Sequence, residues 1–264
     1  MATIDPGHEQ AIINREEDLR EWFTHGKDEL MREVDGIDMG WGGSQRWATS
    51  NMSDMVSGRH LDFACGYGTF LAQIGWRFPR ASLFGLNIDY RGPHACIRRL
   101  LDKAGVRVAL VQADACAMPF PVGCFSSISC FLGLQDMKIG FGEESLRTAV
   151  SEAVRVLKPG GYLILLDELA FDFLLTLVEN ECVEVVLQDE YVPDIKWRRP
   201  VAEAAIKVYS ECWTAQSRAK DVAKRDSVHR ETYQRMKADM EQQLGNKGFY
   251  VPHGTVRMVV VRKI

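Results

Sequence analysis

Residues 61–68 (LDFACGYG) combine an apolar strand end, one carboxylate and two closely spaced glycines. Glycine allows a sharp turn and a close approach of a ligand, and a helix that begins after the turn offers free N–H groups and partial positive charge. The spacing of Phe70, Leu71 and Ile74 predicts such a helix. The stretch therefore predicts the binding site of a nucleoside cofactor.

Two residues separate the candidate cofactors. A dinucleotide-binding turn has the pattern G-x-G-x-x-G, whose third glycine permits close helix–strand packing around a pyrophosphate. Leu71 occupies that third position here, which disfavours a nicotinamide dinucleotide. Asp62 would repel a pyrophosphate, whereas it would attract the ammonium group of an amino acid, directly or through water. The turn therefore favours S-adenosylmethionine.

The turn requires a strand before it and a helix after it, and this alternation continues along the chain. Apolar runs alternate with segments of helical spacing, which predicts a parallel, doubly wound, Rossmann-like α/β sheet. The run at 106–111 is apolar except for Arg107, and it predicts a strand buried on both faces. The expected strands are 60–64, 81–87, 106–111, 125–131 and 162–166.

The last third of the chain follows a different pattern. Residues 183–187 are either a sixth strand or the end of a helix, and residues 200–244 form a long helical region with mixed charge. A strong β run at 256–261 predicts the final strand of a seven-stranded sheet, antiparallel beside the strand at 162–166.

These patterns divide the chain into four expected segments. They are a helical N-terminal cap at 1–50, a cofactor-binding core at 51–190, a helical lid or insertion at 191–250, and a final core strand at 251–264. The segment 39–47 (MGWGGSQRW) is rich in glycine and carries two tryptophans. It predicts a turn that either buries one aromatic side chain or closes over a ligand.

Four segments, in chain order, resemble motifs of the class I S-adenosylmethionine-dependent methyltransferases of the type 11 kind. Residues 61–68 are similar to motif I, and residues 112–121 (QADACAMPFP) resemble motif III. Residues 125–136 resemble the motif IV strand and loop, and residues 155–161 (RVLKPGG) resemble the stretch before the fifth strand. Each match is weak, but four in order are a strong signal. The resemblance implies a seven-stranded Rossmann-like fold and S-adenosylmethionine as cofactor.

The resemblance also implies contacts to the methionine part of the cofactor. Asp62, Ala64, Gly66 and Gly68 belong to motif I, and the cofactor would pass over the backbone of the two glycines. Cys130 would line the pocket at the same end. The alternative role for Cys130, a small buried hydrophobe, is the commoner one for a cysteine.

A short segment before motif I is similar to a Trp-Gly segment of sterol-type methyltransferases. It comprises residues 40–44 (GWGGS). The indole of Trp41 would stabilise the sulfonium by a cation–π attraction of about 0.5–2 kcal/mol. The match does not imply a sterol substrate.

Other residues are expected at the adenosine part. The resemblance implies that Asp114 accepts a hydrogen bond from the adenine amino group and that the N–H of Ala115 meets a ring nitrogen. Where the family commonly has an acidic residue for both ribose hydroxyls, this chain has Asn87. An uncharged hydrogen bond nets about 0.5–1.5 kcal/mol, against about 1.5–3 kcal/mol for a charged one. We therefore expect weaker ribose anchoring by Asn87, with Ile88 against the adenine and Asp89 as a second ribose candidate.

The reaction itself demands little of the protein. A methyl group leaves an activated sulfonium by in-line displacement, so alignment and exclusion of water matter most, and no catalytic residue is required. Strand ends of a doubly wound sheet present its ligands. On that ground Glu168 and Asp136 are weak candidates for a base, with Asp167 and Gln135 beside them, and a capping or solvent-facing role is the alternative for each.

Composition excludes several classes of function. The net charge of −4 argues against nucleic acid as a partner, and the seven cysteines show no metal-ligand spacing, so no metal is expected. We expect reduced thiols, no signal peptide, no membrane span and a cytoplasmic location. The long charged helical region with an apolar stripe is compatible with a homodimer.

The predicted function is methyl transfer from S-adenosylmethionine to a small-molecule acceptor, with the helical insertion setting substrate choice. Two alternatives come from other readings of the same turn. One is a nicotinamide-dependent oxidoreductase, which Leu71 and Asn87 disfavour. The other is a scaffold that binds S-adenosylmethionine without turnover, for which a damaged glycine turn would be typical.

Overall fold

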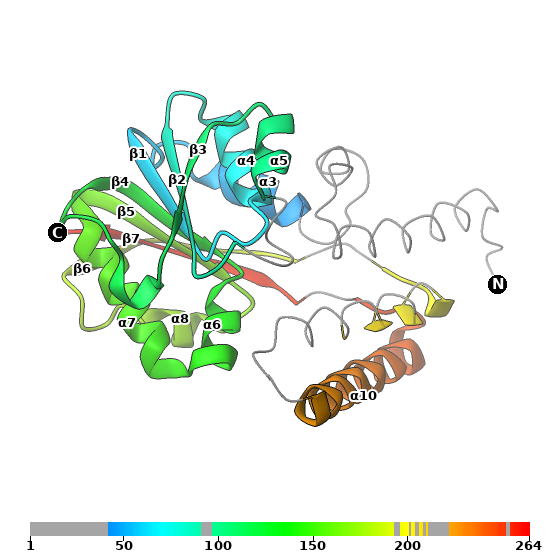
Figure 1. Ribbon diagram of the computed structural model, residues 1–264. Helices are drawn as coiled ribbons and strands as arrows, with labels where there is room; N and C mark the ends of the chain where they lie inside the picture. The colour runs from blue at the N-terminus through cyan, green and yellow to red at the C-terminus, as the bar shows by residue number, and fades with distance from the viewer. Residues whose placement is uncertain are drawn as a thin grey trace. The chain divides into compact units, whose positions relative to one another are not determined.

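The structure, a computed structural model, describes residues 42–90, 97–192, 196–200, 202–203, 206–207, 210, 222–251 and 254–264 (Figure 1). Most of the expected N-terminal cap, with Trp41, lies outside these residues. The described residues form two compact units. One comprises residues 43–192 and 255–264, and the other comprises the described residues between 196 and 254.

The larger unit is built on one mixed sheet with the strand order β3-β2-β1-β4-β5-β7-β6. The strands β1 to β5 are parallel, and β7 runs antiparallel between β5 and β6. This confirms the predicted doubly wound sheet with its antiparallel final strand. The strands are β1 (Arg59–Phe63), β2 (Ser82–Asn87), β3 (Val108–Gln112), β4 (Phe125–Phe131), β5 (Leu157–Asp167), β6 (Val183–Tyr191) and β7 (Val256–Lys263).

Helices cover both faces of this sheet, with α6 to α8 on one side and α3 to α5 on the other (Figure 1). Leu61 and Phe63 of β1 pack with Ile128 of β4 and with the apolar side of α7 in one core. The helices of this unit are α3 (Gly42–Asn51), α4 (Thr69–Arg77), α5 (Ile97–Lys103), α6 (Leu134–Phe141), α7 (Glu143–Val156) and α8 (Phe171–Thr176), with the 3-10 turn η2 (Ala115–Ala117).

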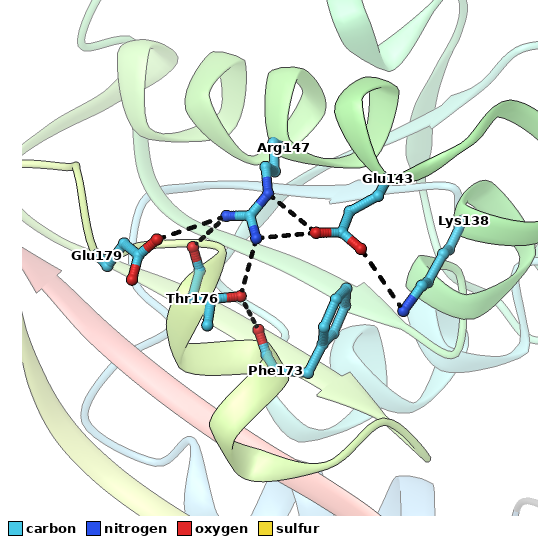
Figure 2. Close-up of polar contacts among 6 residues, drawn as sticks. All are labelled: Lys138, Glu143, Arg147, Phe173, Thr176 and Glu179. Atoms are coloured by element: carbon cyan, nitrogen blue, oxygen red, sulfur yellow. Dashed lines mark hydrogen bonds and ion pairs between the residues drawn. The ribbon is translucent and has the colours of Figure 1, made fainter.

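The three helices after β4 and β5 are braced by one arginine (Figure 2). Nη1 of Arg147 on α7 donates to the carbonyl oxygen of Thr176, 2.6 Å away, at the end of α8. Nη2 of Arg147 lies 2.9 Å from Oε1 of Glu143, whose Oε2 lies 3.9 Å from Nζ of Lys138 on α6. Nζ of Lys138 in turn lies 3.6 Å from the ring centre of Phe173. Through Lys138, these contacts link α6, the helix that carries Asp136, to α7 and α8.

Three expectations about elements need correction. The run at 106–111 does not form a strand buried on both faces, because β3 begins at Val108, lies at the edge of the sheet and has no fully buried residue. The glycine-rich segment 39–47 is not a turn throughout, because α3 begins at Gly42. The fifth strand begins at Leu157 rather than Tyr162, because the Lys-Pro-Gly-Gly stretch is already extended.

The smaller unit contains the long helix α10 (Val222–Lys247), which agrees with the predicted helical region. Arg199 pairs with Glu241 of α10, with Nη1 to Oε1 at 2.6 Å. The backbone of Trp197 exchanges two hydrogen bonds of 2.8 Å with that of Tyr250. Among the described residues, no helix is both long and apolar enough to cross a membrane.

Candidate cofactor site

The turn after β1 is held in left-handed conformations. Its φ angles are 53° at Ala64, 53° at Gly66 and 81° at Gly68, and α4 begins at the next residue, Thr69. A left-handed φ costs a non-glycine residue about 1–2 kcal/mol, so Ala64 carries local strain. A Cβ on Gly133 would lie 2.6 Å from the Cβ of Ala64, so the loop after β4 packs closely on this strained residue.

The two glycines of the turn have different surroundings. A Cβ added to Gly66 would meet no heavy atom of the described residues within 4 Å. A Cβ added to Gly68 would lie 2.7 Å from Cγ1 of Ile97 on α5. Gly66 therefore leaves space beside the backbone that a ligand can use, whereas Gly68 permits the close packing of α5.

Asn87, at the end of β2, holds the same turn. Its Oδ1 accepts a hydrogen bond from the Gly66 N–H at 3.0 Å, and its Nδ2 donates to the Gly66 carbonyl at 2.9 Å. The side chain is buried, at 5% relative exposure. One N–H and one acceptor lone pair of the amide remain for another partner. The first role of Asn87 in this structure is thus to fix the glycine turn, a role that sequence reasoning missed.

The residues expected at the adenine lie beside this position. Ile88 is 44% exposed although it is apolar, which suits a residue that packs against a planar ligand. Asp114 is the N-cap residue of η2, and its Oδ1 accepts a hydrogen bond from the Cys116 N–H at 2.8 Å. Oδ2 of Asp114 is the oxygen that would accept a hydrogen bond from the adenine amino group. Ala115 is buried next to it.

Asp62 is almost completely buried, at 1% exposure. The hydroxyl of Ser129 on β4 donates to its Oδ1 at 2.5 Å. Burial raises the pKa of Asp62 to about 7, and the Ser129 hydrogen bond offsets part of that rise. Oδ2 accepts no hydrogen bond from the described part of the chain. Asp62 is therefore a carboxyl group with one committed oxygen and an ionisation that a nearby cation would favour.

The carboxyl ends of β4 and β5 carry the three acids considered as bases. Oδ2 of Asp167 accepts hydrogen bonds from the N–H groups of Leu134 and Gln135, at 3.0 and 3.2 Å. Asp167 therefore caps α6, which is the alternative role foreseen for it. Its Oδ1 is buried without a partner, and burial raises the pKa of Asp167 to about 7.

Asp136 differs from Asp167 because its side chain reaches solvent. Two effects raise the pKa of Asp136 to about 6. The larger is partial loss of hydration next to the protein, and the smaller is the negative charge of Glu168. Glu168 is half-buried next to Asp167. The electrostatic coupling places Asp136, Asp167 and Glu168 in one acidic cluster. A group with a pKa near 6 can accept a proton at neutral pH.

Two other residues complete the comparison with the expected site. Cys130 has 0% exposure and belongs to the hydrophobic core, so the structure places it as a buried hydrophobe. Gln45 of α3, which the sequence analysis overlooked, is 4% exposed, and its Nε2 donates to Oγ1 of Thr69 at 3.0 Å. Its Oε1 is buried without a partner. The sequence around Gln45 predicts a loop, so the position of this side chain becomes visible only in the structure, where residues 42–51 form a helix.

No metal site is formed by the described residues, among which no group of three or more His, Cys, Asp or Glu side chains could hold an ion. The site fits a cofactor of another kind. The open backbone at Gly66, the exposed Ile88 and the uncommitted oxygen of Asp62 would contact a nucleoside with an amino-acid tail. The sheet order defines a Rossmann-like fold, and its topological switch point, where such folds bind their ligands, lies between β1 and β4.

Comparisons with known proteins find similarity to methyltransferases in the middle of the chain. Residues 61–165 match the family described as Methyltransferase domain. A demethylmenaquinone methyltransferase of Thermus thermophilus is 32% identical over 133 residues, which are 50% of this chain and 56% of that protein. A fatty-acid O-methyltransferase of Mycolicibacterium smegmatis is 29% identical over 120 residues, 46% of this chain and 40% of that protein. The chain therefore spans about half the length of the curated relatives it matches.

A solved structure supports the fold over most of the chain. The structure of the cyclase SpnF has a TM-score of 0.56 and 17% identity, and it covers 85% of this chain and 83% of that one. Residues 61–165 are therefore similar to the methyltransferase domain of enzymes. The fold alone does not fix the reaction, since the name of this neighbour is that of a cyclase.

Proposed function

We propose that the chain binds S-adenosylmethionine at the β1 turn and transfers its methyl group to a small organic acceptor. The observation that carries this proposal is that Gly66 combines open space on one side with a fixed backbone. Gly66 has free space beside it, and both polar ends of its peptide backbone are locked by Asn87. A rigid backbone with room for a ligand is what a bound nucleoside thioether needs.

Each part of the site has an assigned role under this proposal. Asp62 would face the cofactor's ammonium group, Ile88 would pack against the adenine, and Asp114 would accept from its amino group. Asn87 would offer its remaining N–H and lone pair to the ribose, and Asp89 is the second candidate there. The proposed contacts of Trp41 concern a residue outside the described part of the chain.

S-adenosylmethionine supplies a methyl group on a positively charged sulfur, which an acceptor takes by in-line displacement. The chain's residues would align the acceptor, exclude water and, for a protonated acceptor, remove one proton. Asp136 suits that last task better than Asp167, because it reaches solvent and its pKa is raised to about 6. Asp167 is committed to the N-terminus of α6.

The names of two relatives support a proposal for the class of acceptor. Those relatives are described by their action on demethylmenaquinone and on a fatty acid. We propose a small acceptor with a large apolar part, which would receive the methyl group at carbon or oxygen. A homodimer through the long helix and a cytoplasmic location stay predictions of the sequence.

The direct test measures release of S-adenosylhomocysteine by the full chain with a panel of acceptors. The panel contains a demethylated quinol, a fatty acid and a short polar amine as a contrasting class. The proposal expects release that depends on one of the apolar acceptors. Tight cofactor binding with no release in any case would favour the scaffold alternative, and no cofactor binding would refute the proposal.

A further inference from the structure

Four polar side chains are buried together inside the sheet, at the boundary of β1 and β4. The register pairs His60 with Ser127 and Asp62 with Ser129. Residues two apart on a strand point to the same face, so the four side chains share one face of the sheet. Their exposures are 0% for His60, Ser127 and Ser129 and 1% for Asp62.

Hydrogen bonds join these side chains into one chain. Nδ1 of His60 lies 2.8 Å from Oγ of Ser127, and Nε2 of His60 lies 3.1 Å from Oγ of Ser129. Oγ of Ser129 lies 2.5 Å from Oδ1 of Asp62. The network therefore runs from Ser127 through both ring nitrogens of His60 to the carboxyl group in the cofactor site.

Along this hydrogen-bond network, every group must donate in the same direction. Burial lowers the pKa of His60 to about 3, so the ring is neutral and has one N–H. When Asp62 is a carboxylate, Ser129 donates to it, so Nε2–H must donate to Ser129 and Nδ1 must accept from Ser127. When Asp62 is a carboxylic acid that donates to Ser129, Ser129 donates to Nε2, and the ring proton sits on Nδ1.

We propose that this chain is a reversible hydrogen-bond relay, in which the tautomer of His60 follows the ionisation of Asp62 and the cofactor's ammonium group sets the carboxylate direction. The inference rests on the proposed function, because it requires the amino-acid end of the cofactor at Asp62. His60 and Ser129 are then positioning residues, since they act on the cofactor through Asp62.

The two donor directions of the network differ in two ways. The carboxylate direction holds one proton fewer, and the proton of the His60 ring is on the other nitrogen. On the change to the carboxylate, the O–H bond of Asp62 breaks, an N–H bond at Nδ1 is replaced by one at Nε2, and the network gives up one proton to water. The cofactor's ammonium group supplies the compensating charge.

Among the described residues, the other titratable groups near Asp62 supply no compensating charge. They are Cys65 in the turn, Tyr90 after β2 and Cys130 on β4. Burial raises the pKa of each of these three groups, so all three are neutral at pH 7. A ligand cation is therefore the change that this part of the site is built to register.

The test is nitrogen NMR on the full chain with ¹⁵N-labelled histidine at pH 6, below the pKa of about 7 for Asp62. The two-bond couplings of each ring show which nitrogen carries the proton. The ligands are S-adenosylhomocysteine and 5′-methylthioadenosine, which lacks the amino-acid end. We expect the Nδ1–H tautomer in the free protein, the Nε2–H tautomer with S-adenosylhomocysteine, and no change with 5′-methylthioadenosine. His229, in the smaller unit, serves as the internal reference.

Calorimetry in buffers of different ionisation enthalpy gives a second readout. We expect release of up to one proton with S-adenosylhomocysteine and none from this network with 5′-methylthioadenosine. Ser129→Ala breaks the link, so in the variant saturated with S-adenosylhomocysteine the His60 tautomer should no longer respond. An unchanged His60 tautomer in a wild-type protein saturated with S-adenosylhomocysteine would overturn the relay, whereas failure of the wild type to bind would refute the proposed function instead.

Discussion

The two halves of the sheet's carboxyl edge use their polar groups differently. On the β1–β2 side, Asn87 is bonded to the backbone of Gly66, and the space beside that glycine is open. On the β4–β5 side, Asp136, Asp167 and Glu168 form an acidic cluster, and two of these groups have raised pKa values. The first half is shaped by backbone geometry and the second by charge. We propose that the first binds the cofactor and the second faces the acceptor.

The largest effect is expected at Gly66. Gly66→Val places a branched side chain in the open space and forces a left-handed φ of 53° on it. We expect about a 1,000-fold loss of S-adenosylhomocysteine affinity, or about 4 kcal/mol, in isothermal calorimetry.

Gly105→Val is the matched control for this substitution. Gly105 has φ 69° and also nothing within 4 Å of an added Cβ, but it follows α5, away from the turn. It should lose stability without losing affinity. Equal affinity losses in the two variants would show that strain, and not occupation of the ligand space, explains the result.

The next largest effect tests the role of the acidic cluster on the β4–β5 side. If Asp136 removes a proton, Asp136→Asn should lower kcat/KM about 100-fold at pH 7.5, since general base catalysis contributes about 10²–10⁴-fold. The wild-type rate should rise with pH through about 6, and the variant should lose that rise. S-adenosylhomocysteine affinity should not change. A variant with the wild-type pH profile would exclude Asp136 as the base.

Asn87→Ala tests whether the turn needs its lock. It removes both hydrogen bonds to Gly66 and leaves the Gly66 backbone without those partners, which should cost about 1–3 kcal/mol of stability. We expect about a tenfold loss of S-adenosylhomocysteine affinity, measured beside urea unfolding. Asn51→Ala, which removes one hydrogen bond to the carbonyl of Trp47 on α3, is the control. Unchanged affinity would show that the turn keeps its shape without Asn87.

Asp167 gives a prediction for stability against pH. Its pKa is raised from 3.8 to about 7, so the folded state favours the protonated form. Its contribution to stability is complete below about pH 4 and declines by about 1.4 kcal/mol per pH unit toward pH 7. Asp167→Asn keeps an acceptor for the α6 N–H groups and should remove this decline in urea unfolding at pH 5 and 7. A slope equal to the wild type's would refute the assignment.

The smallest effect is expected at Gln45. Its buried Oε1 has no partner, and Gln45 is linked to Thr69, the first residue of α4. Gln45→Ala should weaken S-adenosylhomocysteine about threefold and leave 5′-methylthioadenosine binding unchanged, if the amide meets the amino-acid end. Equal losses for both ligands in calorimetry would place its effect on the turn as a whole.

The sequence predicted what depends on local pattern. Glycine spacing at Gly66 and Gly68 and the alternation of apolar runs were sufficient for the turn and for the parallel strands, and the strong run at 256–261 predicted β7. The largely apolar run at 106–111 misled, because apolar composition does not distinguish an edge strand from a central one.

Side-chain hydrogen bonds between distant segments could not be predicted from the sequence. The lock between Asn87 and Gly66 and the bonds from His60 to Ser127 and Ser129 join residues on different strands and turns. No spacing rule relates them, because only the strand order brings β4 beside β1. Gln45 was missed for a similar reason, since a helix starting between two glycines is atypical.

The central claim is that the open backbone at Gly66 is the seat of a nucleoside thioether. Isothermal calorimetry of the full chain with S-adenosylhomocysteine tests it most directly, with Gly66→Val measured in parallel. The account predicts one site per chain with micromolar or tighter affinity that the substitution abolishes. No binding heat in the wild type, or equal binding by the folded variant, would contradict it.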